Sequence, residues 1–597
     1  MKKFLFIAYI FLTLLFMSTI AGAAGNPKIA YILNFPEAQA HYVDVEMTIS
    51  GLEQQTTNLK MAVWTPGSYM IREFAKSVEG FTAGYKGDAL SFKKINKNTW
   101  KIGTAGVTEL KVNYRVYAFE ISVRTAFIDA SHAFLANANI FMYPQGMLNQ
   151  PSTVKIIPYK GWTKVSTGLD PVGSDPFVLK APNYDILFDS PIEVGTQDIF
   201  DFTVGAVNYE VAMYNGGNYD KDRLKTDMAK IVKTQATLFG ENPNKRFTFI
   251  VHNYLQGTGG LEHLSSTVLS VDRDGYDTEK GIQEFLRLAA HEHFHLWNVK
   301  RLRPVALGPF DYENENYTTN LWIAEGFTAY YELKTVQQAG ISNEDAFLTG
   351  LAGKLGAHDN QPGSKVQSAA ESSFDAWIKF YRPNENSSNS GISYYVKGLL
   401  IGYMLDLEII NNSSGKYSLD DVMKYTYNEY YKTRKRGYTD AEFRAALEKF
   451  AGKNLDEIYK KYVNGVAPVE HQKYLVYAGY TITNELADSN KPTLGIGTPK
   501  SGRLLVTLVS RNTAAWIGGI NVNDEITAVD GNTVTDLAGI LNGKSIGDKI
   551  NLTVIRDGRE LILPITLLRN PSVKYNITSV ADPSEKQLAV RKKWLSL

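Results

Sequence analysis

The sequence predicts a multidomain α+β protein: an N-terminal antiparallel β-sandwich, a mostly helical middle domain and a small strand-rich module near the C-terminus. From about 27 to 210, short segments alternate apolar and polar residues between Gly, Pro and Asn, which is typical of a sandwich. From about 219 the apolar residues recur with the helical period. From about 476 to 570, short strand-like runs with Gly-rich turns return. These three observations give the order of the domains.

The individual elements follow this order. Alternating runs at 42–49 and 110–117 predict strands of the sandwich, and 247–252 predicts a strand of the middle domain. The expected helices are 221–240, 281–300, 322–338, 393–410, 418–433 and 439–450. We therefore expect domains at 24–212, 213–472 and 476–572, followed by a tail at 573–597 with no clear pattern.

Composition excludes several classes of protein and site. The chain has 597 residues, 44% hydrophobic and 21% charged, as in an ordinary globular protein. Its net charge of +1 makes non-specific binding of nucleic acid improbable. It has no cysteine, which excludes disulfides, thiolate nucleophiles and Cys-ligated metal. A metal in this chain must therefore be held by His, Asp or Glu.

The N-terminus has the pattern of a secretory signal peptide. Lys2 and Lys3 precede an apolar run of about 16 residues and an A-x-A site that predicts cleavage after Ala23. The run is shorter than the roughly 20 residues of a spanning helix, and no later run is long enough to span a bilayer. We expect residues 1–23 to be removed, and a mature chain that is periplasmic or secreted and has no membrane span.

The string HEHFH at 291–295 predicts a zinc-binding helix. His291 and His295 are four residues apart, so on a helix they lie on one face and can bind the same Zn²⁺. Glu292 then lies beside the metal, and His293 is expected to point away. The alternative, three histidines on a solvated helix face, is disfavoured because the chain has only 9 histidines.

A catalytic zinc site needs a third protein ligand. Glu325 is set in the apolar segment LWIAEGFTAYY at 321–331, where an unpaired carboxylate would be costly. Zinc is the partner that this position predicts, giving a His₂Glu site with one zinc per chain. Glu332 is expected to be an exposed or capping glutamate. In such a site Glu292 acts as general base on a zinc-activated water.

Together these residues resemble the glycyl aminopeptidase family of PDZ-containing gluzincins, which is related to alanyl-type aminopeptidases and to thermolysin. The matching strings are HEHFHLWNVKR at 291–301, LWIAEG at 321–326, YVKG at 395–398, GGLEH at 259–263 and WTPGSY at 64–69. The resemblance covers nearly the whole mature chain and implies a thermolysin-like catalytic domain. It implies that Tyr395 donates to the oxyanion and that Glu262 binds the substrate's α-amino group.

Glu262 also has an argument of its own. An edge strand containing Gly259 and Gly260 beside a zinc site can align an extended peptide, and a carboxylate at its end can pair with a cationic N-terminus. A solvated strand-end glutamate is the alternative. Two departures from the family pattern are His263, which replaces an expected Asn, and the 29 residues of 296–324, which make a longer gap than in the alanyl-type relatives.

The C-terminal module resembles a PDZ domain of the bacterial protease type. The strings LGIG at 494–497, NTAAWIGGI at 512–520 and DEITAVDG at 524–531 carry this resemblance. The loop at 494–497 could hold the C-terminal carboxylate of a peptide on backbone N–H groups. A packing module without a ligand is the alternative.

The sequence therefore predicts an exported zinc aminopeptidase that releases small N-terminal residues such as Gly or Ala from peptides with a free N-terminus. The preference for small residues rests on the resemblance alone. One alternative is a zinc endopeptidase in which Glu262 is structural. The other is a PDZ-based peptide-binding protein with an inert peptidase domain.

Overall fold

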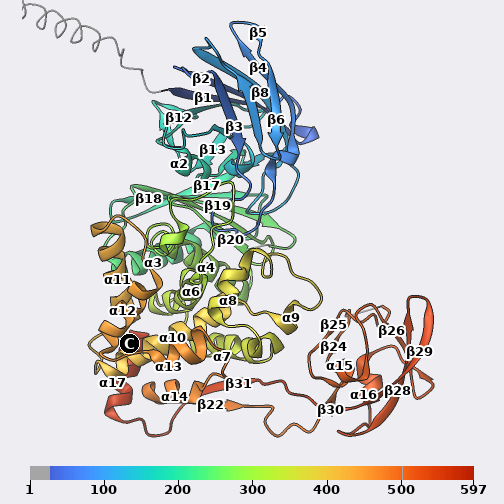
Figure 1. Cartoon of the computed structure of the whole chain (residues 1–597). Helices are drawn as coiled ribbons and strands as arrows, with labels where there is room; N and C mark the ends of the chain where they lie inside the picture. Colours follow the sequence, from blue (N-terminus) through green and yellow to red (C-terminus); the bar gives the residue numbers. More distant parts are fainter. Residues whose placement is uncertain (1–26, 258, 500–501, 597) are drawn as a thin grey trace, which may run out of the picture. The chain divides into compact units, whose positions relative to one another are not determined.

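The computed structural model describes residues 27–257, 259–499 and 502–596. The expected signal peptide lies outside these residues. The chain divides into two compact units, one of residues up to 65 with 72–198 and the other of 66–71 with 199–597. We call them the N-terminal unit and the catalytic unit (Figure 1). No helix in the described ranges is long and apolar enough to cross a membrane.

The N-terminal unit is built from strands, as predicted. Its eight-stranded sheet has the order β14-β15-β12-β1-β2-β8-β4-β5. These strands are β1 (Lys28–Asn34), β2 (Tyr42–Ser50), β4 (Val78–Tyr85), β5 (Asp88–Ala89), β8 (Glu109–Tyr117), β12 (Ser152–Ile157), β14 (Asp170–Val172) and β15 (Asp175–Ala181). The pairing is antiparallel except for β1 with β12, which are parallel and are joined by a long crossover connection.

Two four-stranded sheets complete the N-terminal unit, in the orders β11-β3-β7-β6 and β13-β16-β10-β9. Their strands are β3 (Thr56–Met61), β6 (Phe92–Asn96), β7 (Thr99–Gly103), β9 (Phe127–Ile128), β10 (Ala133–Leu135), β11 (Met142–Pro144), β13 (Lys164–Thr167) and β16 (Ile192–Gly195), with one helix, α2 (Tyr184–Phe188). In β2 and β8 every second residue is buried, which is the alternation that predicted these strands.

The catalytic unit contains a five-stranded sheet of order β17-β18-β19-β21-β20. The strands are β17 (Asp198–Val204), β18 (Val207–Tyr214), β19 (Arg246–Tyr254), β20 (Gly259–Glu262) and β21 (Ser266–Asp272). The sandwich was expected to extend to 212, but β17 and β18 join this sheet because β18 pairs in parallel with β19. β20 pairs antiparallel with β21 and is an edge strand, as predicted for 259–263.

Helices make up most of the rest of the catalytic unit. They are α3 (Lys221–Phe239), α4 (Glu279–Phe294), α5 (Leu321–Ala324), α6 (Gly326–Gln338), α7 (Glu344–Asp359), α8 (Ala369–Phe374), α9 (Ser387–Ser390), α10 (Tyr394–Asn412), α11 (Leu419–Thr426), α12 (Asp440–Ala451), α13 (Asp456–Ile458) and α14 (His471–Leu475). Two predicted helices are shorter or broken. α4 ends at Phe294 rather than near 300, and the helix predicted at 322–338 is interrupted at Glu325.

The PDZ-like module is an insertion between two paired strands. β22 (Tyr480–Asn484) and β31 (Tyr575–Ser579) form an antiparallel ribbon that brings both ends of the module together (Figure 1). Between them lie β23 (Pro492–Thr493), β24 (Ile496–Gly497), β25 (Leu508–Val509), α15 (Ala514–Gly518), β26 (Glu525–Val529), β27 (Asn532–Thr533), α16 (Leu537–Leu541), β28 (Lys549–Arg556), β29 (Arg559–Thr566) and β30 (Leu568–Arg569). The module has its own apolar core, which includes Val506, Ile540 and Leu552.

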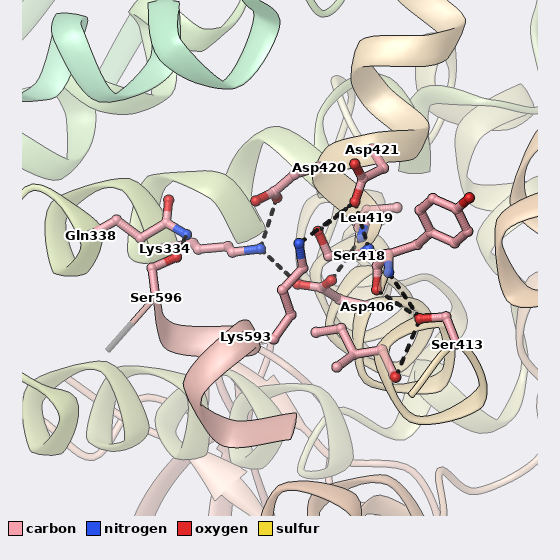
Figure 2. Close-up of polar contacts among 12 residues, drawn as sticks. Lys334, Gln338, Asp406, Ser413, Ser418, Leu419, Asp420, Asp421, Lys593 and Ser596 are labelled. Atoms are coloured by element: carbon pink, nitrogen blue, oxygen red, sulfur yellow. Dashed lines mark hydrogen bonds and ion pairs between the residues drawn. The ribbon is translucent and has the colours of Figure 1, made fainter. Parts of the chain in front are cut away.

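The residues expected to be a tail without a clear pattern form β31 and α17 (Glu585–Leu595). α17 returns to the helices of the catalytic unit, where Trp594 is fully buried and donates from Nε1 to the hydroxyl of Tyr330. Figure 2 shows Lys334, which is ion-paired to Asp406 at 2.9 Å and to Asp420 at 2.8 Å. The C-terminal helix therefore completes the core beneath α6.

Candidate metal centre and peptide site

His291 and His295 lie at the C-terminal end of α4, where their side chains meet on one face. His295 is one residue beyond the helix but keeps helical backbone angles, φ −61° and ψ −17°, so the four-residue spacing still aligns the rings. Their ring centroids are 4.9 Å apart. His293 is buried elsewhere, with Nδ1 2.7 Å from Oε1 of Gln235, which confirms that it points away from the pair.

Each of the two imidazoles is oriented through its Nδ1. Nδ1 of His291 lies 2.9 Å from Oε2 of Glu332, and Nδ1 of His295 lies 3.1 Å from the carbonyl oxygen of Asn298. Partners of this kind fix the tautomer and leave Nε2 to face a metal. Glu332 was expected to be exposed or capping, but it is largely buried against His291. Its position seven residues after Glu325, two helical turns along the same face, was the signal for this role.

Glu325 reaches the two Nε2 atoms from the break between α5 and α6. Its Oε2 lies 3.6 Å from Nε2 of His291 and 3.2 Å from Nε2 of His295. The candidate ligand atoms of these three residues all lie within 4.8 Å of one another. Nδ2 of Asn298 donates to the carbonyls of Ile323 and Ala324, so the residue that orients His295 also holds the turn that carries Glu325.

A close helix crossing positions Glu325 relative to α10. Gly326 follows Glu325, and a Cβ on it would overlap the backbone of Gly398. A Cβ on Gly398 would in turn overlap the carbonyl oxygen of Trp322. The glycines of the strings LWIAEG and YVKG therefore allow α6 and α10 to touch backbone to backbone, which brings Tyr395 to the site.

Tyr395 lies over the first histidine ligand. Its ring is stacked on that of His291, with centroids 6.1 Å apart and an interplanar angle of 23°. Burial raises the pKa of the Tyr395 hydroxyl well above its usual value, and the charge of Glu325 raises it further. Tyr395 therefore stays a neutral hydrogen-bond donor beside the candidate metal centre, as an oxyanion donor must.

Glu292 and Glu262 close the other side of the site. Both are buried, and their carboxylates come within 4.8 Å of each other and of His295. β20 runs directly over Glu292, because a Cβ on Gly260 would overlap its carboxylate. Gly259, the other predicted substrate-binding glycine, begins β20 with a φ of +94°.

The carboxylates of the site lack compensating donors. Glu262 Oε1, Glu292 Oε2 and Glu325 Oε1 are buried and have no hydrogen-bond partner among the described residues. Burial raises the pKa of the Glu292 carboxyl to about 7. Burial also opposes ionisation of Glu325, but His295 and His291 outweigh it and hold its pKa below the usual range. Two imidazole nitrogens and one carboxylate are a donor set that fits Zn²⁺, and the uncompensated acids fit cationic occupants.

A loop segment that sequence reasoning left without a role also reaches this site. Residues 66–71 belong to the catalytic unit. A Cβ on Gly67 would meet the carboxylate of Glu262, so the loop covers this residue closely. Tyr69 is buried against Trp377, with ring centroids 5.6 Å apart. After burial, the charges of Glu325 and Glu262 are the next causes that raise its pKa. The string WTPGSY, which the sequence connected to the family only by resemblance, therefore includes residues that pack against the candidate site.

The geometry agrees with what comparison with known proteins finds. The models of the Peptidase M61 N-terminal domain, M61 glycyl aminopeptidase and the PDZ domain match residues 30–196, 284–401 and 488–567. A solved aminopeptidase N family protein from Idiomarina loihiensis is 30% identical, with a TM-score of 0.88, covering 95% of this chain and 100% of that one.

Two more distant matches complete the comparison. An M1 zinc metallopeptidase from Deinococcus radiodurans is 13% identical, with a TM-score of 0.46, covering 74% of this chain and 93% of that one. The serine protease Do-like HtrA of Lactobacillus helveticus is 34% identical over 114 residues, 15% of this chain and 28% of that protein. The chain thus spans less than a third of this curated relative.

Proposed function

The chain belongs to the M61 glycyl aminopeptidase family of metallopeptidases, and from this premise we propose that it is a zinc aminopeptidase that releases small N-terminal residues. One Zn²⁺ per chain would be held by His291, His295 and Glu325. When bound, Zn²⁺ supplies a Lewis acid that polarises the scissile carbonyl and makes a water molecule more acidic. The remaining chemistry belongs to side chains of this chain.

The observation that carries the proposal is the set of buried carboxylate oxygens without partners. Glu262, Glu292 and Glu325 each present one, and a buried charge without a partner is costly. One divalent metal satisfies the carboxylate of Glu325 but leaves Glu262 beyond it. The ammonium group of a substrate would pair with the carboxylate of Glu262. An ammonium held there would fix cleavage one residue from the N-terminus.

The residues then divide the reaction among them. β20 aligns the peptide as an added strand on the sheet edge, with its ammonium at Glu262. Glu292 accepts the proton of the attacking water and transfers it to the leaving amine. Tyr395 donates its hydroxyl hydrogen to the oxygen on which negative charge develops.

The preference for Gly or Ala is supported by the family description and by the crowding around Glu262. Gly67 lies directly against the carboxylate of Glu262, and the ring of Tyr69 in the same loop is buried, which leaves little room for a large first residue. We expect kcat/KM to fall along the series Gly or Ala, Leu and Phe in otherwise identical amide substrates.

The test replaces the proposed ammonium partner. In Glu262→Gln, kcat/KM for a free-amine alanine anilide should fall. The loss should correspond to an increase of about 2–5 kcal/mol in activation free energy, because a buried charge pair is broken. The N-acetylated anilide has no ammonium and should change far less. Zinc content is measured in both proteins. An equal loss for the two substrates would make Glu262 structural and favour an endopeptidase.

An inert peptidase domain that serves a PDZ-based binding protein remains the alternative from another class. It predicts no turnover of either anilide by zinc-loaded protein. The Glu292→Gln protein is the reference for such inertness, since the amide cannot take the proton of water while the three ligands stay intact.

We also propose that the protein is exported, to the periplasm or beyond, on the basis of the signal-like pattern at residues 1–23. Mature protein purified from its natural source should begin at Ala24. A chain that still begins at Met1 would contradict export by cleavage. The PDZ module is proposed to bind the C-terminus of a peptide at its 494–497 loop.

A further inference from the structure

A second cavity of the catalytic unit lies next to the candidate active site. It has a volume of about 410 Å³ and is lined by Gln361, Gln367 and Ser372 together with residues 378–380, 382–384, 387–388 and 390–393. Phe380 connects it to the metal centre, because its ring is stacked on Tyr395 with centroids 5.7 Å apart. Tyr395 in turn is stacked on His291 at 6.1 Å. The cavity therefore begins within about 12 Å of the first metal ligand.

The cavity presents hydrogen-bond donors that lack acceptors. Gln367 is only 4% exposed, and its Oε1 accepts from the backbone N–H of Ile392 at 3.0 Å. Its Nε2 and the Oγ of Ser388 are buried without a partner among the described residues. A buried amide nitrogen in this position costs free energy until an acceptor reaches it.

The charged residues that line the cavity are basic. No Asp or Glu is among its lining residues, whereas Lys379 and Arg382 are. Lys379 is already paired with Asp375 at 2.7 Å. Arg382 gives one N–H to the carbonyl oxygen of Ile71 at 3.4 Å, which leaves most of its guanidinium available. Ile392 and Ser393 line the cavity just before α10, so the positive end of this helix also faces it.

Apolar side chains stand at the same rim. Phe380 is 37% exposed and Ile378 is 58% exposed, which is unusual for such residues beside a cavity. They offer contact surface to a peptide that crosses from the metal centre to the donors. An extended chain advances about 3.3 Å per residue, so the span of up to about 12 Å from His291 to Phe380 at the rim of the cavity corresponds to three or four residues beyond the cleaved bond.

We propose that this cavity binds a carboxylate of the peptide substrate three or four residues beyond the cleaved bond, through Gln367, Ser388 and Arg382. The inference rests on the proposed aminopeptidase function and adds a substrate class to it. If the carboxylate is the chain end, the preferred substrates are short peptides of about four or five residues. If it is a side chain, the enzyme prefers an acidic residue at that place in longer peptides.

The experiment compares three pentapeptides with an N-terminal Ala: a C-terminal acid, the matching amide, and an amide whose last residue is Glu. Their affinities are measured by calorimetry on zinc-loaded Glu292→Gln protein, so the result does not require turnover. The kcat/KM values of wild-type protein are measured in parallel, with an alanine anilide that ends before the cavity as the reference. Arg382→Gln and Gln367→Leu test the cavity, and Lys230→Gln on the exposed face of α3 is the charge-matched control.

We expect the acid to bind and react at least about tenfold better than the plain amide, with the difference mostly in KM. Arg382→Gln and Gln367→Leu should reduce this ratio toward one, whereas Lys230→Gln should keep it. A Glu-ended amide equal to the acid would show that the cavity accepts a carboxylate from either source. A tightly bound Glu-ended amide beside an acid no better than the plain amide would assign the carboxylate to a side chain. Equal affinity of the acid and both amides would overturn the inference about the cavity. If the anilide is still turned over in that case, the aminopeptidase proposal stands. Loss of anilide turnover in zinc-loaded wild type refutes that proposal instead, while the calorimetry still decides the cavity.

Discussion

Glu332 controls which nitrogen of His291 faces the metal centre. Its carboxylate accepts from Nδ1 at 2.9 Å. Burial raises the pKa of this acid, but His291 together with the charges of Lys354 and Arg287 lowers it below its usual value. Glu332→Gln should therefore weaken zinc binding by about 10–100-fold while leaving all three ligands in place. Competition with a chromogenic chelator measures this. Glu457→Gln, which removes a paired glutamate on the surface, is the control, and equal zinc affinity in the two variants would contradict the role.

The role of Tyr395 can be tested independently of zinc binding. Tyr395→Phe keeps the ring that is stacked on His291 and removes only the hydroxyl. We expect kcat to fall by about 10²–10³-fold with unchanged zinc content, because one oxyanion donor is lost. Steady-state kinetics on an alanine anilide are the measurement. A change confined to KM would assign Tyr395 to substrate binding.

Lys397, in the string YVKG at 395–398, destabilises the folded protein by an amount that depends on pH. It is 1% exposed, its Nζ has no hydrogen-bond partner in the described parts of the chain, and it lies 5.7 Å from the ring of Tyr462. Burial lowers its pKa from 10.5 to about 8, and the charge of Asp359 only partly opposes this. The unfolded chain thus holds this proton up to a higher pH than the folded chain, so stability gains with rising pH between about 8 and 10.5.

Lys397→Met should consequently stabilise the protein at neutral pH, by at most about 3 kcal/mol, since a shift of one pKa unit is worth 1.36 kcal/mol. The gain should shrink as pH rises through 8 and vanish above about 10.5. Urea unfolding of wild type and variant at pH 7 and pH 10 measures the two differences. A variant less stable than wild type at pH 7 would show that the ammonium has a partner.

At this scale the sequence predicted the residues that the structure brings together at the candidate metal centre, because their spacing and setting in the sequence indicate that chemistry. His291, Glu292 and His295 follow from a four-residue helical repeat, and Glu325 from an acid in an apolar run. Glu332 and Asn298 could not be recognised in the same way. Their roles depend on which nitrogen of a distant ring they meet, and this is set by the packing of α4 against α6.

The elements that hold the site depend on one contact between helices. Gly326 and Gly398 let α6 and α10 approach until backbone meets backbone. The sequence predicted both helices but not the break at Glu325 or the end of α4 at Phe294, because helical periodicity continues through both points. Glycine was the only local sign of the crossing, and a glycine in a helix has several explanations.

Gly398→Ala tests this crossing. The new Cβ would overlap a backbone carbonyl, which cannot move aside like a side chain, so α6 and α10 must separate. We expect a loss of about 1–3 kcal/mol of stability, together with reduced kcat, since Glu325 and Tyr395 lie on the separated helices. Thermal unfolding and anilide turnover are measured together. Gly353→Ala is the matched control, because that helical glycine has open space at its Cβ and should gain about 0.5–1 kcal/mol.

Across the whole molecule, the C-terminal helix supports the helix that carries Glu325. Trp594 of α17 donates to Tyr330 at 2.7 Å, and Tyr330 donates to Asp406 at 2.6 Å. Asp406 in turn pairs with the fully buried Lys334, as Figure 2 shows. The sequence predicted the PDZ module, but residues 573–597 were expected to be a tail with no clear pattern. The five-residue strand β31 pairs with β22, nearly a hundred residues earlier, and Trp594 of α17 contacts Tyr330, 264 residues earlier. No local sequence pattern indicates partners so distant along the chain.

The PDZ module should therefore be removable only if the helix after it is kept. Asn484 and Tyr575 are register partners at the end of the β22–β31 ribbon, so residues 485–574 can be replaced by an Asn-Gly turn that closes an ordinary hairpin. The module has an apolar core of its own, so deleting the module should leave thermal stability close to that of wild type and zinc content and anilide turnover within a few-fold of it.

Truncation after Gly479 removes the same module together with α17, and exposes the buried surface around Tyr330 and Lys334. That protein should unfold at a much lower temperature and lose zinc, because burial of one Trp is worth about 3–5 kcal/mol. Equal stability of the two shortened proteins would show that α17 contributes nothing to the site. Inactivity of both with zinc bound would mean instead that the peptidase needs the PDZ module itself.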